Sequence, residues 1–493
     1  MSEAQTQQPL SKLLADRRAK LDALCERGIE PYPTRFRVET SVTGIRQRFD
    51  GLTAQELEEK DEQIRVAGRL RAIRGQGKVV FADISDGESR LQLFLRKNDL
   101  DDETWELVKL CDLGDFVGAE GRVFRTRTGE LSIRVAALEF LSKSHRPLPE
   151  KHKGLTDLET RARMRYVDLL ANAESRAVFV ARSRIISAIR RYFEAHDFIE
   201  VETPMMQPIP GGATARPFVT HHNTLDLDLY LRIAPELYLK RLIVGGFERV
   251  FEVNRNFRNE GISTRHNPEF TMLEFYWAYA DYEILMDFTE DLVCTVAEEV
   301  VGTLELEWGE HRIDLRRPWK RLSLRDAIFE YSDVTEANLA DRAEMEKTAR
   351  RLGVERIEER SDGKLLAEIY EMTAEPNLIN PTFIIDYPKD ISPLTKEKPG
   401  QPDVVERFEL FIGGIEVANA YTELNDPVEQ RRRFEAQAAA SGGDVDEDFI
   451  LALEHGMPPT GGEGIGIDRL VMLLTGQTSI RDVILFPTLR PRT

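Results

Sequence analysis

Five short runs of alternating apolar and polar residues lie between Ile64 and Leu141, and they constrain the fold more than any other feature. Glycine, aspartate or asparagine turn residues separate each run from the next, which is typical of β-strands. So many strands in so short a segment predict a small five-stranded Greek-key barrel. The runs are residues 64–74, 78–86, 90–96, 115–126 and 130–140.

The charge of this barrel segment differs from that of the whole chain. A net charge of −19 argues against an overall electrostatic hold on nucleic acid. From Ile64 to Phe140, however, 13 lysine and arginine residues stand against 13 aspartate and glutamate residues. The barrel is therefore the predicted RNA-facing part, of the oligonucleotide-binding (OB) type. Its arginine and phenylalanine side chains suit stacking on single-stranded bases, although any small barrel also needs aromatic residues in its core.

At 493 residues the chain is too long for one ordinary domain, so at least two domains are expected. The pattern of elements predicts an α+β protein. Residues 1–63 are expected to form a helical extension, in which the helix Leu10–Gly28 docks by its leucines or presents a basic face to phosphates. Residues 64–142 form the barrel, and 143–160, with mixed proline, glycine and charge, form a linker. Residues 161–493 are expected to hold an antiparallel sheet flanked by helices.

Membrane, disulfide and zinc proteins are not expected. No apolar run is long enough to span a bilayer, and the first residues lack a signal-peptide pattern, which predicts a cytoplasmic protein without membrane contact. The cysteines Cys25, Cys111 and Cys294 are scattered and are expected to be buried small hydrophobic residues. His221 and His222 are adjacent but have no spaced ligand set beside them, so we expect no zinc.

A polar loop between two apolar strands is the first candidate site. Its charged side chains are Arg258, Glu260, Arg265 and His266. Such a cluster is costly unless a ligand occupies it. Arg258 can fork onto a carboxylate or phosphate, and Phe270 offers a flat face to a purine ring. The alternative is a hairpin loop that is merely solvated.

The glycine-rich segment near the C-terminus is the second candidate site. Gly461, Gly462, Gly464 and Gly466 lie on a predicted strand that leads into a helix near Ile467. The glycines allow close approach of a ligand or another backbone. Arg469 falls in the first turn of the helix, where the helix dipole disfavours a cation unless an anion lies nearby. This position predicts a phosphate partner.

These segments resemble the signatures of class II aminoacyl-tRNA synthetases. Arg258 and Glu260 match the second signature, Arg469 ends the third, and residues 197–206 with Pro204 resemble the first, which builds the dimer interface. Longer matches resemble the bacterial lysine-specific branch: residues 161–170, 210–218, 230–242, 257–276, 418–427 and 481–487. Asp197, where glycine is common, and Glu463, where an apolar residue is common, depart from the pattern and put only local geometry in doubt.

The resemblance implies a ligase that joins L-lysine to its tRNA through a lysyl-adenylate, consuming ATP and releasing AMP and diphosphate. Arg258 would bridge the lysine carboxylate and the α-phosphate, and Arg469 would meet the γ-phosphate and, with Phe270, enclose the adenine. Glu260 and His266 would complete the ATP site. Cations must offset the repulsion between the two anions, whereas no general base is needed because the attacking carboxylate is already ionised.

Magnesium, up to three ions with some held mainly by ATP phosphates, is implied at Glu409 and Glu416. A pair of carboxylates on an edge strand is otherwise more often solvated. Both lie on a predicted hairpin that turns at Gly413 and Gly414.

By the same resemblance, Glu236 would meet the α-ammonium of lysine, and Glu274 and Glu423 its ε-ammonium. Other pocket residues would be Gly212, Tyr276, Asn419, Tyr421 and Gly464. An aspartate-specific enzyme would need basic groups where these carboxylates stand, because an unpaired like charge in a closed pocket is costly.

The assignments of Glu416 and of Asn419, Tyr421 and Glu423 conflict with a regular strand. Side chains alternate with period two, so Glu416 would face away from the other three. Both sets must face one cleft. We therefore predict a β-bulge, with ladder pairing broken at Val417 or Ala418 and with Glu416 and Glu423 pointing into the same cavity.

The resemblance also implies that the barrel reads the anticodon, with Phe81 stacking on a base and Arg69, Gln92 and Glu130 contacting base edges. A homodimer is expected, built from the region of Pro204 and a helix from Arg161 to Leu170.

Two alternatives remain. A transferase with the same core that lysylates a protein would lack the front barrel. A regulatory paralogue without catalysis would lack Arg258, Glu416 or Arg469, and all three are present.

Overall fold

The computed structural model describes residues 10–149, 155–213, 215–441 and 445–491. The chain divides into two compact units, residues 1–175 and 176–493, and each is described by itself.

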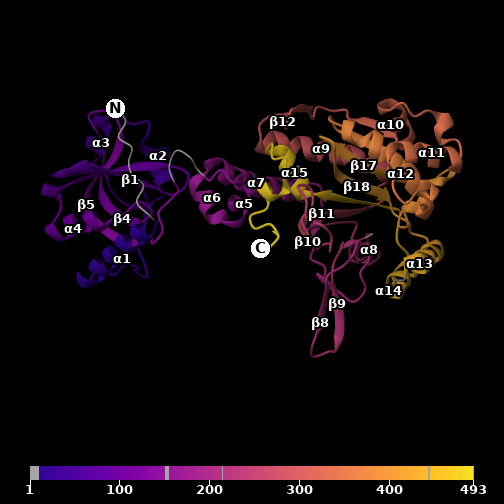
Figure 1. The fold of residues 1–493 in the computed structure, drawn as a ribbon, viewed down its shortest axis with the longest axis horizontal. Coiled ribbons are helices and arrows are strands. Elements are labelled where there is room, and N and C mark those ends of the chain that lie inside the picture. The colour runs from indigo at the N-terminus through magenta and orange to yellow at the C-terminus, as the bar shows by residue number, and fades with distance from the viewer. Residues whose placement is uncertain (1–9, 150–154, 214, 442–444, 492–493) are drawn as a thin grey trace. The chain divides into compact units, whose positions relative to one another are not determined.

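The first unit contains the predicted barrel. Five strands close in the order β1-β2-β3-β5-β4, which confirms the prediction (Figure 1). A helix between β3 and β4 was not predicted. The elements are β1 (Gln63–Gln76), β2 (Val79–Ser85), β3 (Arg90–Arg96), α4 (Asp102–Leu110), β4 (Phe116–Arg125) and β5 (Leu131–Ser142).

The N-terminal helices pack against this barrel rather than standing apart from it. They are α1 (Leu10–Glu26), α2 (Val42–Phe49) and α3 (Ala54–Lys60). Leu24, Ile45 and Phe49 belong to the same hydrophobic core as the strands. Helix α1 also buries Arg17, which donates to the carbonyls of Leu113 and Ser144, so α1 docks through both an apolar and a basic side chain.

One of the three cysteines differs from the expectation of burial. Cys111, and Cys294 in the second unit, are buried, but Cys25 is exposed, because it lies on the outer side of α1, next to the buried Leu24. The helix expected from Arg161 to Leu170 is two helices, α5 (Leu158–Arg163) and α6 (Arg165–Ala171). Met164 leaves helical geometry between them at φ −114° and ψ 50°. Part of the expected linker, residues 150–154, lies outside the described residues.

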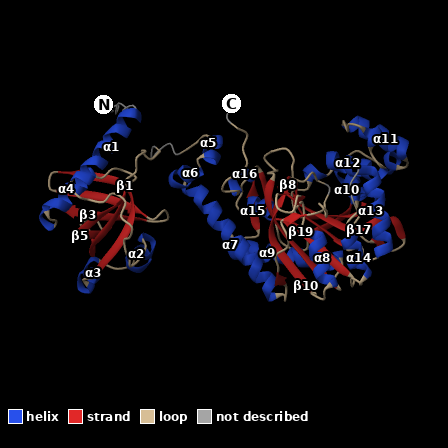
Figure 2. Ribbon diagram, turned by 90° about the horizontal axis from the view of Figure 1, so that it is seen from below, coloured by secondary structure: helices blue, strands red, loops and turns tan. Residues whose placement is uncertain are grey.

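A large, mainly antiparallel sheet forms the centre of the second unit (Figure 2). Its order is β14-β15-β17-β18-β19-β11-β10-β6, with β16 paired to β17. Within the described strands of this sheet, the pairs β10–β6 and β14–β15 are parallel and the others antiparallel. The strands are β6 (Ile199–Glu200), β10 (Arg249–Phe257), β11 (Glu269–Ala278), β14 (Lys320–Ser323), β15 (Thr382–Pro388), β16 (Glu397–Lys398), β17 (Gln401–Ile412), β18 (Ile415–Thr422) and β19 (Thr460–Gly466).

Alternation along β10 and β11 divides the sheet into two faces. Phe251 and Phe275 point into the main core, which they share with helices α7 and α9. Val250 and Tyr276 point to the opposite face and pack with α8. The helices of this unit are α7 (Ala173–Ala195), α8 (Glu236–Val244), α9 (Tyr282–Val300), α10 (Leu324–Tyr331), α11 (Arg342–Leu352), α12 (Asp362–Thr373), α13 (Pro427–Ser441), α14 (Glu447–Glu454), α15 (Ile467–Leu474) and α16 (Ile480–Val483).

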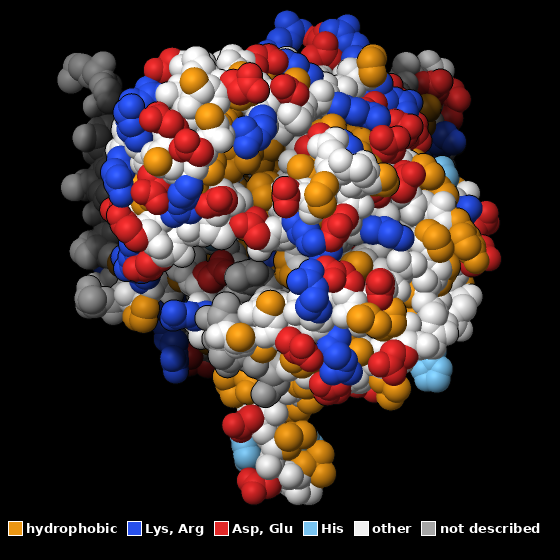
Figure 3. Space-filling model, turned by 90° about the vertical axis from the view of Figure 1, so that its right-hand side faces the viewer, with side chains coloured by type: hydrophobic (Ala, Val, Ile, Leu, Met, Phe, Trp, Pro, Cys, Tyr) orange, Lys and Arg blue, Asp and Glu red, His pale blue; other side chains and the backbone are white. Residues whose placement is uncertain are grey.

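Two small sheets complete the unit. One pairs β12 (Glu305–Trp308) with β13 (His311–Asp314), and the other joins β7 (Met206–Gln207), β9 (Leu227–Leu231) and β8 (Val219–His222). The β8–β9 hairpin projects from the surface with apolar side chains near its end (Figure 3). Val219 and Leu225 on this hairpin are more than half exposed.

Candidate active site

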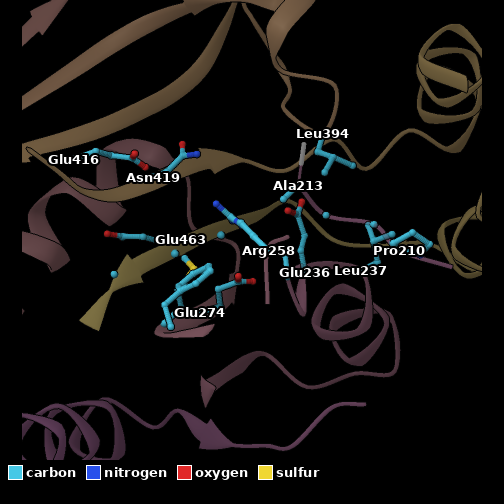
Figure 4. Close-up of a pocket in the computed structure, with 18 of the residues that line it drawn as sticks. Pro210, Ala213, Glu236, Leu237, Arg258, Glu274, Leu394, Glu416, Asn419 and Glu463 are labelled. Carbon is cyan, nitrogen blue, oxygen red and sulfur yellow. The ribbon is translucent and has the colours of Figure 1, made fainter. Parts of the chain in front are cut away.

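A cavity of about 580 Å³ lies on the α8 face of the sheet (Figure 4). Strands β11, β18 and β19 provide its floor, and the loop after β10, the loop 209–213 and the start of α8 provide walls. Most of the predicted lysine and ATP residues line it: Gly212, Glu236, Arg258, Glu260, His266, Phe270, Glu274, Tyr276, Glu416, Asn419, Tyr421, Gly464 and Arg469.

A β-bulge in β18 brings the two ends of this cavity together. Phe411 pairs with Glu416 and Leu410 pairs with Ala418, which leaves Val417 without a partner on β17. The predicted break is thus confirmed at Val417. As a result, Glu416 and Asn419 both line the cavity although their separation in sequence is odd. The hairpin turn at Gly413 and Gly414 is confirmed as well, with positive φ at both residues.

The glycines of β19 turn bare backbone toward the cavity. A Cβ at Gly462 would come within 2.1 Å of a Glu423 oxygen, and one at Gly464 within 2.8 Å of Met272. A side chain at Gly462 would also meet the buried Tyr276 ring, whereas one at Gly464 would require the flexible end of Met272 to move. Gly212 has a different reason, since its φ of +84° is left-handed and a Cβ there would meet Ala234 and Glu236.

The anion side of the cavity centres on Arg258. Its Nε is buried and has no hydrogen-bond partner in the described part of the chain, and its guanidinium lies 5.1 Å from the Phe270 ring centroid. A buried donor without a partner is costly, so this group suits a carboxylate or phosphate ligand. Glu260 lies nearby in the exposed loop.

Arg469, His266 and Glu416 form a second polar group. Arg469 donates to the backbone oxygen of Glu416 at 2.7 Å and contacts its carboxylate at 3.3 Å. The same guanidinium lies 3.3 Å from Nε2 of His266. Burial and the charge of Arg469 lower the pKa of His266. A neutral imidazole beside a guanidinium leaves the positive charge of Arg469 available for an anion.

Glu409 lies next to this group, in an adjoining cavity that Glu416 also lines. It accepts hydrogen bonds from Arg407 at 2.6 Å and from Tyr387 at 2.8 Å. Among the described residues no cluster of three or more histidine, cysteine or acidic side chains is arranged to hold a metal. Two carboxylates with oxygen donors, one of them partly exposed, do fit a magnesium ion that takes its other ligands from phosphate and water.

The cation side of the cavity contains Glu274 and Glu236. Glu274 is buried, and its Oε2 has no hydrogen-bond partner among the described residues. Burial raises the pKa of Glu274 to about 8, with Glu236 acting in the same direction and Arg258 opposing. Glu236 instead accepts hydrogen bonds from Lys240 at 2.6 Å and Tyr421 at 2.7 Å.

Lys240 is the residue that the sequence analysis missed. It is fully buried and forms ion pairs with both Glu236 and Glu423. Glu423 is on the expected side of the sheet, against Gly462, but it does not line the cavity as predicted, because it is buried behind the wall and bound to Lys240. The i,i+4 spacing of Glu236 and Lys240 on one helix was the available signal. Arg407, two residues before Glu409, was also missed.

The predicted anticodon residues are less closely grouped. Phe81 lies on β2 and Gln92 on the adjacent strand β3, and Glu130 immediately precedes β5, where the Ser132 hydroxyl donates to Gln92 at 3.0 Å. Phe81 is 5.3 Å from Phe94, whose ring is 5.7 Å from Phe124. Glu130 is paired with Arg46. Arg69 is further along β1, donating to the Gly114 carbonyl and stacked on Phe116.

Comparison with known proteins assigns the chain to a family. The family of tRNA synthetases class II (D, K and N) matches residues 157–490, and the family of OB-fold nucleic acid binding domains matches residues 64–141. The chain therefore belongs to the class II tRNA synthetases.

Relatives that match over nearly the full chain show to which branch of this class it belongs. Lysine–tRNA ligases of Carboxydothermus hydrogenoformans and Moorella thermoacetica are 52% and 54% identical to it, over 98% and 97% of this chain and 99% and 98% of theirs. The lysine–tRNA ligase of Bacillus subtilis is 50% identical over 99% of both chains. Within its class, the chain is a member of the lysine–tRNA ligase family.

No helix in the described ranges is both long and apolar enough to cross a membrane.

Replacing Glu274 tests the electrostatics of the site. Because the folded state holds this proton up to about pH 8, Glu274 contributes stability that is complete below its unfolded pKa and is lost as the pH rises through about 8. We expect Glu274→Gln to remove this component, so that the variant gains stability relative to the wild type as the pH increases from 5 to 8.5. Urea unfolding across this range measures the difference, and parallel curves would contradict the assignment.

Proposed function

We propose that the cavity on the α8 face is where this ligase activates lysine with ATP, before transferring it to tRNA. The observation that carries the proposal is that one pocket holds two buried atoms without a hydrogen-bond partner in the described structure, Nε of Arg258, which suits an anion, and Oε2 of Glu274, which suits a cation. A lysine molecule carries both complementary charges. Chains of the family join lysine to its tRNA with consumption of ATP, and this chain is such an enzyme.

In this arrangement Arg258 binds the lysine carboxylate and the α-phosphate, and holds the two anions together for the in-line attack. Glu236 binds the α-ammonium, and Glu274 binds the ε-ammonium. Tyr276, Asn419 and Tyr421 enclose the side chain, while Gly212 and Gly464 leave room for it. Glu423 acts with Lys240 behind the wall and sets the charge that the ammonium meets.

ATP occupies the other end. Phe270 and Arg469 enclose the adenine, and Arg469, His266 and Glu260 bind along the phosphates. Glu409 and Glu416 are the residues that would hold magnesium, up to three ions when the phosphates supply further ligands. The bound metal would neutralise phosphate charge. The protein residues orient the nucleotide and exclude water.

The parts outside the pocket complete the function. The barrel, residues 64–142, reads the anticodon through Phe81, Arg69, Gln92 and Glu130. The N-terminal helices support it, residues 143–160 link it to the catalytic part, and the enzyme works in the cytoplasm as a homodimer.

Lysine-dependent exchange of diphosphate into ATP tests the pocket. We expect exchange with lysine but not with aspartate or asparagine, the substrates of the neighbouring branches. In the same assay Glu423→Gln should weaken the binding of lysine by roughly 2 to 4 kcal/mol and leave the binding of ATP nearly unchanged. The substitution leaves the positive charge of the buried Lys240 less well neutralised beside the lysine ammonium. The double variant Lys240→Met with Glu423→Gln should recover part of the loss. Equal losses for lysine and ATP would contradict the assignment.

The barrel face provides an independent test. We expect Phe81→Ala to lower the efficiency of tRNA charging by about 1–3 kcal/mol, the value of one lost base stack. Exchange without tRNA should not change, because the barrel is not part of the first step. Leu113→Ala, at an exposed apolar residue of the same unit, is the matched control. A Phe81 variant with normal tRNA KM would count against anticodon stacking.

The dimer proposal rests on exposed apolar side chains of β6 and of the small sheet that contains the β8–β9 hairpin. Ile199, Met206, Val219 and Leu225 are each about half exposed or more, and β7 pairs with β9 so that Met206 adjoins the hairpin. We expect twice the chain mass in sedimentation at micromolar concentration. Met206→Glu should shift the protein toward monomer, whereas Val428→Glu, at an exposed position on α13, should not. A wild-type monomer would refute the proposal.

A further inference from the structure

Strand β19 carries a single ionisable side chain, Glu463. The residue borders the cavity, but its carboxyl group lies on the opposite face of the sheet, against Thr289 of α9. Glu463 is 2% exposed, and its cross-strand neighbours are Phe275 and Ala420, both fully buried in the main core. Figure 4 shows its carboxyl group directed away from Arg258. A carboxyl group is costly in such a place unless it is neutral or paired.

Its one partner in the described structure is neutral. Oγ1 of Thr289 on α9 lies 2.8 Å from Oε1 and 2.7 Å from Oε2 of Glu463. The same hydroxyl lies 2.8 Å from the Leu285 carbonyl, to which it donates. A hydroxyl has one proton to give, so when Thr289 donates to Leu285 it accepts from Glu463, which must then carry a proton.

Among the described residues, no charged group on the elements packed around Glu463 compensates its charge. On β11 and β18 its neighbours are Phe275 and Ala420. The ionisable residues of α9 on either side of Thr289, Asp287 and Glu290, both face Arg321. Glu274 is adjacent to Phe275 but points to the opposite face of the sheet, into the cavity.

The front of the same strand forms the floor of the pocket. Gly462 lies between Tyr276 and Tyr421, and Gly464 lies between Glu274 and Asn419. These four side chains are the proposed walls of the lysine site. Because Gly462 and Gly464 contribute only backbone, any displacement of β19 moves the pocket floor directly. The approach is already close, since a Cβ at Gly462 would collide with Glu423.

We infer that Glu463 is a positioning residue: as a neutral carboxylic acid bound to Thr289, it ties β19 to α9 and so fixes the backbone floor of the lysine pocket. This inference rests on the proposed function of that pocket. Leu285, one turn before Thr289, packs 3.0 Å from where a Gly461 Cβ would stand, so the helix contacts β19 at two successive inward positions.

The inference predicts a particular pH dependence. Burial raises the pKa of Glu463 well above its usual value, and its hydrogen bond with Thr289 opposes this shift only in part. Together with the lack of a charged partner among the described residues, this favours the protonated acid in the folded state. At alkaline pH, loss of the Glu463 proton places an unpaired charge beneath the sheet and breaks the hydrogen bond that the acid donates to Thr289. Lysine affinity should fall at high pH while the site residues themselves are unchanged.

Three variants test the Glu463–Thr289 hydrogen bond in the full-length enzyme. Glu463→Gln keeps the shape and a neutral donor, so it should match the wild type near pH 7 and resist the alkaline rise in lysine KM. Thr289→Val removes the acceptor, and we expect its lysine KM to rise about fivefold at pH 7 with little change for ATP. Thr289→Ser keeps the hydroxyl and should remain within about twofold of the wild type.

Exchange kinetics between pH 7 and 10, with thermal unfolding at each pH, separate the outcomes. Coinciding pH profiles for the wild type and Glu463→Gln would overturn the inference, as would equal effects of Thr289→Val and Thr289→Ser. If Glu463→Gln fails to fold, the threonine pair still decides. Failure of the proposed function would look different, because the wild type itself would then show no lysine-dependent exchange at any pH.

Discussion

One unpaired residue, Val417, sets the geometry on which the site depends. Side chains of a regular strand alternate, so Glu416 and Asn419 would point to opposite faces of the sheet. The bulge shifts the register once, between the pairs Phe411–Glu416 and Leu410–Ala418. Glu416, with Arg469, therefore shares a cleft with Asn419 and Tyr421. A reaction in which an amino-acid carboxylate attacks a phosphate needs these two ends in one place.

Charge in the cleft is balanced mostly within the protein. Glu416 is paired with Arg469, Glu409 with Arg407, and both Glu236 and Glu423 with Lys240. Buried ion pairs of this kind hold side chains in position more than they add net stability. Among the described residues that line the cavity, Nε of Arg258 and Oε2 of Glu274 are the buried side-chain atoms without a hydrogen-bond partner. Because the other charges are paired within the protein, these two groups are the ones left to bind the charged ends of the proposed lysine ligand.

The sequence predicted the elements better than their contacts. Alternation located all five barrel strands, and the glycine-rich strand with its following helix, because period and turn residues are local properties. The bulge was predictable only because two site assignments disagreed with period two. Lys240 was not predicted, because acidic side chains alone do not determine the charge of a pocket, which is the sum of its positive and negative groups.

Burial and the exact ends of helices were the hardest features to predict from the sequence. Cys25 is exposed although its neighbour Leu24 is fully buried, since which side of α1 meets the barrel depends on the partner surface. The helix expected at 161–170 breaks at Met164, where Arg161 and Arg165 converge on Asp168. Both arginines lie at helical spacing from Asp168, so the sequence pattern does not distinguish one continuous helix from two shorter ones.

Strand β19 shows why the back of a catalytic sheet also bears on function. Its glycines let ligand and side chains approach the backbone, but glycine loses more conformational freedom on folding than other residues and offers nothing to pack. The strand must then be held from behind and from its edges. Apolar contact with Leu285 restrains distance but little direction, whereas a hydrogen bond between Glu463 and Thr289 restrains both. The openness of the pocket on one face is thus matched by a directional contact on the other.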